Sequence, residues 1–250
     1  MRRKYFQRPL RFIALLLLAG PLGVAARAED KLRPLPDDAG KYVLSLPNNY
    51  DPKKEYELIV ALHGSGDPPE HFVKALRSLM PAREFILAAP YSRDLMEWDS
   101  DELPVVEATL ADVKKTCRIK TDRVLLLGFS AGGGFGFYFV AQKPELFSGF
   151  ASFAQTNNAV PEDDLAAAKD LPIFYSVGKR DKYSKPSEES AARLKKLGFT
   201  FEYDTPADIG HTLTPEQLKR MFAWFDGVFK KRAEAKAEDS EDAVIGLRKR

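Results

Sequence analysis

Short apolar runs alternate with amphipathic stretches from residue 41 to residue 230. The apolar runs predict β-strands, and most of them are apolar at consecutive positions, as in a sheet covered on both faces. The first run instead alternates apolar with polar residues, which favours an outer antiparallel strand. The predicted strands are Lys41–Leu46, Glu57–Leu62, Phe85–Ala89, Arg123–Leu127, Gly149–Phe153, Ile173–Val177 and Thr200–Tyr203.

Between these strands, apolar residues recur every three to four positions, which is the spacing of one face of a helix. The predicted helices are Val105–Cys117, Asp163–Lys169, Ser187–Leu197 and Pro215–Phe229. Thr214 is the expected N-cap of the last helix. Strands that alternate with helices predict an α/β fold with a doubly wound, mainly parallel sheet.

The first 28 residues differ from this pattern. A basic opening that ends at Arg11 precedes an apolar run, Phe12–Leu18, and small residues follow at Ala26–Ala28, as in a secretory signal peptide. The apolar run is shorter than the roughly 20 residues that span a membrane. We therefore expect a secreted or periplasmic protein with no stable membrane span after cleavage of residues 1–28. A retained anchor is the alternative.

Charge and composition narrow the possible functions. Removal of residues 1–28 takes away six basic residues and no acidic ones, which leaves 32 Lys+Arg against 36 Asp+Glu and changes the net charge from +2 to −4. The remaining chain has no basic stripe, which argues against nucleic acid as a partner. One cysteine, Cys117, and three histidines do not make a zinc site. We therefore expect no metal and no cofactor.

Two flanking segments lack the strand and helix pattern. Residues 29–40 are charged and are expected to form a linker into a catalytic domain at 41–230. Residues 231–250 are rich in Ala, Glu, Lys and Asp, with few apolar anchors. This composition predicts a charged tail that is disordered or a frayed extension of the last helix.

The strand Arg123–Leu127 is followed by Gly128-Phe129-Ser130-Ala131-Gly132. A Gly-x-Ser-x-Gly between a strand and a helix is typical of a nucleophile elbow, a turn so tight that the neighbours of the serine must lack bulk. Ser130 is therefore the predicted nucleophile. Four glycines within residues 132–136 are unfavourable in a helix and predict close packing of that helix against the sheet.

An elbow serine needs a base and an acid, which follow it in the chain order serine, acid, histidine. The histidines are His63, His71 and His211. Because the first two precede Ser130, His211 is the predicted base. Asp181 follows the next-to-last strand in a glycine turn and is the predicted acid, which would orient the imidazole. Asp204 and Asp208 are alternatives, but both lie beyond the last strand.

The loop Leu62–Asp67 follows a strand upstream of the elbow. This position predicts half of an oxyanion hole, made by the backbone N–H groups of Ser65 and Ala131. Ligands of open α/β sheets bind at the carboxyl ends of the strands. Three residues near such ends are candidates for substrate binding, each with a structural role as the alternative: Trp98, Gln155 and Tyr183.

These stretches together resemble the phospholipase/carboxylesterase family of the α/β-hydrolase superfamily, which includes acyl-protein thioesterases. The resemblance spans residues 40–230 and rests on His63-Gly64-x-Gly66-Asp67, Gly128-Phe129-Ser130-x-Gly132-Gly133, the turn at 178–181, and Gly210-His211 followed by Thr214-Pro215-Glu216-Gln217-Leu218. It implies an α/β-hydrolase fold with the triad and oxyanion residues named above. Ala131 replaces the glutamine common in that family. Polyhydroxybutyrate-depolymerase-like and feruloyl-esterase-like groups share the same core.

The sequence thus predicts an exported serine hydrolase that cleaves carboxylic esters through an acyl-enzyme. About 20 residues separate the strands Gly149–Phe153 and Ile173–Val177. This leaves room for a minimal lid, so we expect an open pocket that accepts soluble or polymer-end esters. The alternatives are a serine peptidase on the same fold, which no accessory gating domain supports, and an inactive hydrolase-fold binding protein.

Overall fold

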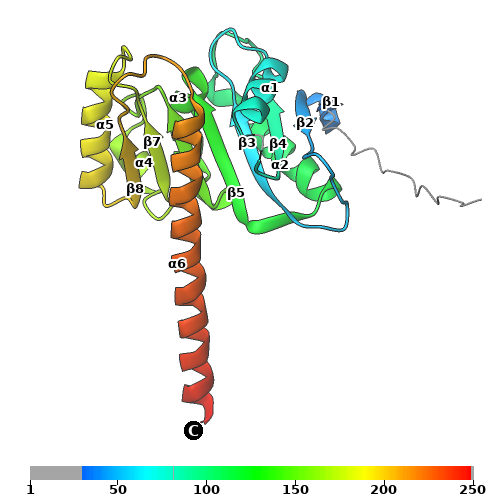
Figure 1. Cartoon of the computed structure of the whole chain (residues 1–250), viewed down its shortest axis with the longest axis vertical. Helices are drawn as coiled ribbons and strands as arrows, with labels where there is room; N and C mark the ends of the chain where they lie inside the picture. The colour runs from blue at the N-terminus through cyan, green and yellow to red at the C-terminus, as the bar shows by residue number, and fades with distance from the viewer. Residues whose placement is uncertain (1–29, 81, 249–250) are drawn as a thin grey trace, which may run out of the picture.

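The computed structural model describes residues 30–80 and 82–248, so the predicted signal peptide lies outside the described residues. Within these ranges the strands form one sheet in the order β1-β2-β4-β3-β5-β6-β7-β8 (Figure 1). The strands β1 and β2 are antiparallel to their neighbours, and the other six run parallel. The bounds are β1 Asp30–Pro34, β2 Lys41–Ser45, β3 Tyr56–Leu62, β4 Phe85–Pro90, β5 Ile119–Phe129, β6 Gly149–Phe153, β7 Ile173–Ser176 and β8 Phe201–Asp204.

Helices cover both faces of the sheet. Side chains of α1 and α6 pack on one face, and those of α2, α3, α4 and α5 pack on the other. Successive residues of β3 point alternately into the two cores, since Leu58 and Val60 belong to one and Ile59 to the other. The bounds are α1 Pro69–Leu79, α2 Leu103–Thr116, α3 Ala131–Gln142, α4 Glu162–Ala166, α5 Ser184–Lys196 and α6 Pro215–Arg248, with short 3₁₀ turns at Pro36–Asp38, Ser100–Glu102 and Pro144–Leu146.

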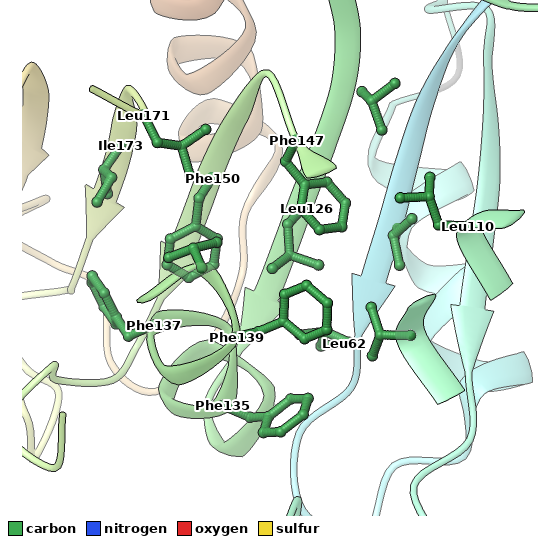
Figure 2. Close-up of a cluster of buried hydrophobic side chains, with 14 of the residues drawn as sticks. Leu62, Leu110, Leu126, Phe135, Phe137, Phe139, Phe147, Phe150, Leu171 and Ile173 are labelled. Atoms are coloured by element: carbon green, nitrogen blue, oxygen red, sulfur yellow. The ribbon is translucent and has the colours of Figure 1, made fainter. Parts of the chain in front are cut away.

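Aromatic side chains fill the core between α3 and the sheet (Figure 2). The Phe137 ring meets the Phe150 ring edge-on, with centroids 5.0 Å apart, and Phe139 packs in the same way on Phe147 at 5.7 Å. All four are buried. The aromatics of the glycine-rich helix are therefore core residues, which anchor the helix that begins directly after Ser130.

The predicted doubly wound sheet is confirmed, and each predicted strand and helix is present. The linker prediction is wrong for Asp30–Pro34, which forms the edge strand β1 and pairs with β2. Three of its five residues are charged and four are exposed, so they carry no hydrophobic alternation, and charge on an edge strand discourages further pairing. The helix α1, for which the sequence pattern predicts no element, buries Phe72, Val73 and Leu76.

The last helix continues well past its predicted end at Phe229. It runs to Arg248 and projects beyond the sheet (Figure 1), and residues 230–238 are exposed. Ala, Glu, Lys and Arg are strong helix formers, so a charged extension continues the helix without burying an apolar face. Of the two alternatives for the charged tail, the structure therefore matches an extension of the last helix and not a disordered segment. Among the described residues, no helix is both long enough and apolar enough to cross a membrane.

Candidate active site

Ser130 occupies a strained turn between β5 and α3. Its backbone has φ 52° and ψ −120°, a conformation that an L-residue rarely adopts and that costs roughly 1–3 kcal/mol. Two backbone hydrogen bonds hold the turn: the Ser130 N–H donates to Phe153 O (2.9 Å), and the Gly132 N–H donates to His63 O (3.1 Å). The strands on both sides of β5 therefore fix the position of the serine.

The two glycines of the elbow leave no room for a side chain. A Cβ on Gly128 would lie 2.2 Å from Gly132 O, and a Cβ on Gly132 would lie 2.2 Å from Leu62 O. Both contacts are with backbone, which cannot move without displacing the sheet. Gly136 is equally restricted, because its Cβ would lie 2.5 Å from the Phe150 ring. The predicted close packing of the glycine-rich helix is confirmed.

A chain of two hydrogen bonds connects Ser130, His211 and Asp181. His211 Nε2 lies 2.8 Å from Ser130 Oγ, and His211 Nδ1 lies 2.9 Å from Asp181 Oδ2. The Asp181 side chain is fully buried, whereas that of His211 is 34% exposed. Because a carboxylate only accepts, Nδ1–H donates to Asp181, which leaves the Nε2 lone pair to accept the serine proton. This geometry can pass a proton from the Ser130 hydroxyl to His211, with Asp181 orienting the imidazole.

The loops that carry the acid and the base are packed against each other. A Cβ on Gly178 would lie 2.2 Å from Ile209 O, and the Arg180 N–H donates to the same Ile209 carbonyl at 2.9 Å. Asp181 is aligned further by the Tyr183 N–H, which donates to Asp181 Oδ1 (2.9 Å). The glycine turn after β7 therefore sets the distance between Asp181 and His211.

The two alternative acids have other partners. Asp204 accepts hydrogen bonds from Ser176 Oγ (2.8 Å) and Arg220 (2.9 Å). Asp208 pairs with Arg180 at 2.7 Å on the surface. The carboxylate that contacts His211 is therefore that of Asp181, as the position after the next-to-last strand predicts.

The loop after β3 lies beside Ser130. A Cβ on Gly64 would lie 3.3 Å from the Ser130 Cβ. Within residues 30–80 and 82–248, the N–H groups of Ser65 and Ala131 donate no hydrogen bond. These two donors are therefore available to a negatively charged oxygen near the serine, as an oxyanion hole requires.

His63, at the start of this loop, is fully buried, and burial lowers the pKa of its imidazole. Its Nδ1 lies 2.9 Å from Gly64 O, and its Nε2 lies 3.0 Å from Ser92 Oγ. Because Gly64 O only accepts, Nδ1 carries the proton, and Nε2 accepts from the Ser92 backbone N–H (3.4 Å), while the Ser92 hydroxyl donates to Asp94 O (2.7 Å). A neutral histidine thus fastens the loop to the segment after β4. The sequence motif located this loop, but nothing in it indicated the role of Ser92.

Trp98, in the segment after β4, contacts the same loop. Its indole N–H donates to His63 O (3.0 Å), and its ring lies 4.9 Å from the His63 ring and stacks on Phe135 at 5.0 Å. The indole N–H is therefore occupied by the protein. These contacts match the structural alternative for Trp98, while its contact with substrate stays a prediction.

The other two pocket candidates lie near the start of α3 and near His211. Gln155 packs over the start of α3, where a Cβ on Gly134 would lie 3.1 Å from the Gln155 Cγ. The Tyr183 ring lies 5.9 Å from the His211 ring. Between β6 and β7 the chain has one five-residue helix, α4. The described structure therefore has no large lid in that segment.

A mainly parallel sheet with a serine elbow after β5, an acid after β7 and a histidine after β8 defines the α/β-hydrolase fold. Solved structures agree on this fold. A fungal esterase from Rhizomucor miehei superposes with a TM-score of 0.65 at 14% identity, over 82% of this chain and 84% of that one. A ferulic acid esterase from Anaeromyces mucronatus superposes with a TM-score of 0.59 at 14% identity, over 76% and 87% of the two chains.

Sequence comparison identifies the family. The phospholipase/carboxylesterase family model matches residues 100–228, just over half of the 250 residues, and the chain belongs to this family of hydrolases. It is similar to an Arabidopsis thaliana protein named probable carboxylesterase SOBER1-like, with 24% identity over 164 residues. That match covers 63% of each chain, so the similarity spans less than two thirds of the relative's length.

Proposed function

We propose that the protein is an exported serine carboxylesterase. The Ser130 hydroxyl oxygen attacks the ester carbonyl carbon while His211 Nε2 takes its proton. The imidazolium then returns the proton to the departing alcohol, which leaves an acyl group on Ser130. Water, activated by His211, hydrolyses this acyl-enzyme. Asp181 holds the imidazole tautomer and stabilises the imidazolium, and the Ser65 and Ala131 N–H groups stabilise the oxyanion.

One observation carries this proposal: the hydrogen-bonded chain from buried Asp181 through His211 to a serine in a strained elbow. A scaffold that only binds ligands has no need to maintain a strained serine with a base 2.8 Å from its oxygen. Membership of the phospholipase/carboxylesterase family supports ester cleavage over peptide cleavage.

An open site supports small or polymer-end esters as substrates. His211 is exposed to solvent at 34% of its side chain, and the segment between β6 and β7 has a single short helix. A lipase-type acyl chain needs an enclosed apolar channel, whereas a soluble ester or the end of a polymer can approach an open edge. We therefore favour substrates that are not long-chain lipids.

Export follows from the signal-peptide pattern at residues 1–28, which lie outside the described residues. We expect the mature protein to begin near Glu29 and to be found outside the cytoplasm. Fractionation of the producing cells followed by N-terminal sequencing tests this. A cytoplasmic protein that retains Met1 would refute export and leave the catalytic proposal untouched.

The catalytic proposal is tested with p-nitrophenyl esters of two to twelve acyl carbons, run beside peptide p-nitroanilides. We expect hydrolysis of the short esters, little activity on the long ones and none on the anilides. Ser130→Ala should lose the activity while keeping the unfolding temperature of the wild type. Cleavage of anilides in preference to esters would favour the peptidase alternative, and no hydrolysis of any ester by the wild type would overturn the proposal.

A further inference from the structure

Three segments that carry or flank the acid and the base meet at one group of buried polar side chains. Ser176 is the last residue of β7, and the turn that carries Asp181 follows it. Asp204 is the last residue of β8, and Gln217 lies in the first turn of α6, so the loop with His211 runs between them. Ser176 and Gln217 are buried. We call this group the Gln217 cluster: Ser176, Asp204, Thr214 and Gln217.

A continuous path of hydrogen bonds joins the members of the Gln217 cluster. Gln217 Nε2 donates to Ser176 Oγ (2.9 Å), and Ser176 Oγ donates in turn to Asp204 Oδ2 (2.8 Å). At the other end of the same amide, Gln217 Oε1 accepts from the Thr214 N–H (3.0 Å) and the Thr214 hydroxyl (2.9 Å). A buried network whose donors and acceptors are matched in this way favours a single arrangement. One amide therefore connects the end of the histidine loop to the strand that leads to the acid.

The start of the histidine loop is bound to the acid turn by backbone hydrogen bonds. The Val177 N–H donates to Asp204 O (3.0 Å), and the Lys179 N–H donates to Pro206 O (2.9 Å). The chain then passes through the histidine and reaches α6, where the Gln217 cluster binds it a second time. Both ends of the loop are therefore held against β7 or the turn that follows it, which limits how far the imidazole can move from the acid.

Helix capping accounts for only part of these contacts. Thr214, the predicted N-cap of α6, accepts the Gln217 N–H (3.3 Å), and Gln217 reaches back to the Thr214 N–H, which together form a capping box. Such a box needs only the side-chain oxygen, which glutamate provides as well as glutamine does. A carboxylate could not also donate to Ser176, whereas the amide does. The nitrogen of Gln217 therefore serves the link between α6 and β7.

We propose that Gln217 is a positioning residue for the reaction. Through Thr214 and Ser176, it holds the end of the histidine loop against β7. This keeps His211 Nδ1 within hydrogen-bond distance of Asp181, a contact of 2.9 Å, and so keeps Nε2 directed at the serine. The inference rests on the proposed function and adds to it a residue that acts through the base without touching substrate.

The kinetic test breaks the link in two ways. Ser176→Ala removes the hydroxyl between Gln217 and Asp204, and Gln217→Met replaces the amide with an apolar side chain of similar length. Each should lower kcat for p-nitrophenyl acetate, per folded molecule, by about 10-fold with KM little changed, which is less than the roughly 100-fold cost of a 1 Å misplacement. Because both changes break one path, the double variant should be little slower than either single variant. Ser176→Ala removes a single atom and serves alone if the larger change prevents folding.

Two further variants separate positioning from stability. Gln217→Glu keeps the oxygen that caps α6 but cannot donate to Ser176, so kcat should fall as it does in Ser176→Ala. Wild-type kcat in this variant would reduce Gln217 to a helix cap and overturn the inference. Tyr42→Phe is the matched control, because it removes a buried hydrogen bond, to Asp112 (2.6 Å), in β2, which the strands β4, β3, β5 and β6 separate from β7. It should lower the unfolding midpoint and leave kcat unchanged.

A spectroscopic measurement tests the same inference without turnover. The hydrogen bond to Asp181 selects the neutral His211 tautomer with its proton on Nδ1, and nitrogen NMR of the imidazole measures the share of that tautomer. We expect this share to fall in Ser176→Ala and Gln217→Met and to stay at the wild-type level in Tyr42→Phe. If the tautomer shifts in this way but no ester is hydrolysed, the catalytic proposal fails and the positioning role stands. If esters are hydrolysed while the link variants lose only stability, or lose kcat no more than Tyr42→Phe does, the inference is overturned.

Discussion

The serine and the histidine of the site are held in opposite ways. Ser130 sits between buried strands, where backbone carbonyls lie 2.2 Å from where a Cβ on either elbow glycine would be. His211 sits on a surface loop that packs against the loop carrying Asp181, where Ile209 lies against Gly178 and its carbonyl accepts the Arg180 N–H. The position of the proposed nucleophile is thus set by the core, whereas that of the proposed base depends on contacts between two loops.

Because of this difference, substitutions on the two sides of the site should have different effects. A change on the serine side strains the central sheet and lowers the free energy of unfolding. A change on the histidine side can displace the base while the core stays intact. Stability and activity should therefore respond together in the first region and separately in the second.

The largest effect is expected from His211→Ala. Removal of the base should lower kcat by roughly 10⁴- to 10⁶-fold. Because the side chain is partly exposed and its loop lies at the surface, the unfolding midpoint should stay close to that of the wild type. The unfolding midpoint in urea and the rate of ester hydrolysis, measured on the same preparation, check the two expectations. A loss of stability that parallels the loss of activity would contradict the proposed independence of this loop.

Gly132→Ala tests the serine side. Its Cβ would lie 2.2 Å from Leu62 O, so the variant should lose about 3 kcal/mol of unfolding free energy and lose ester hydrolysis with it. Gly227→Ala is the matched control, because a Cβ at this exposed position in α6 has nothing within 4 Å and should stabilise the helix by about 0.5–1 kcal/mol. Equal stability of the two variants would refute the steric account.

Gly178→Ala should move the histidine loop. A displacement of about 1 Å can cost roughly 100-fold in rate, so we expect kcat/KM to fall by about that factor with a smaller loss of stability than in Gly132→Ala. Gly210→Ala, beside the histidine, is the control, since the nearest atom to its Cβ lies 4.0 Å away. It should stay within a few-fold of the wild type. Equal activities of these two variants would show that the contact at Ile209 does not position His211.

Trp98→Phe probes the support of the oxyanion loop. Phenylalanine keeps an aromatic ring between His63 and Phe135 but loses the N–H that donates to His63 O. The loss of one hydrogen bond predicts a decrease in kcat of about 2- to 10-fold with KM little changed. Trp224→Phe, on the opposite face of the sheet, should have no such effect. A change confined to KM would instead favour a direct contact between Trp98 and substrate.

The smallest effect concerns pH and His63. Burial lowers the pKa of this imidazole below its ordinary value of about 6.5. The unfolded chain therefore binds the imidazole proton more readily than the folded chain does. The folded protein loses stability as the pH falls from about 6.5 toward the pKa of the folded state. Urea unfolding from about pH 7.5 to about pH 5.5 should show a steeper decline for the wild type than for His63→Gln. His71→Gln, exposed on α1, should decline like the wild type.

Much of this site could be predicted because its constraints are local. Gly128 is required by a contact with Gly132 inside the same turn, and the chain order leaves one histidine and a well-placed aspartate. The contact between Gly132 and Leu62 is long-range, but the Gly-x-Ser-x-Gly pattern already specifies a glycine at this position. The roles of Ser92 and Trp98 could not be predicted, since they depend on how the segment after β4 folds back on His63. Edge strand β1 could not be predicted, because three of its five residues are charged and no apolar alternation marks it.

The central claim, that Ser130 is a nucleophile activated by His211, is tested most directly by labelling with a fluorophosphonate and locating the adduct by mass spectrometry. We expect one adduct per chain, on Ser130, and strongly slowed labelling in His211→Ala. Ser130→Ala should remain unlabelled. An unlabelled wild type, or an adduct on a different serine, would contradict the account.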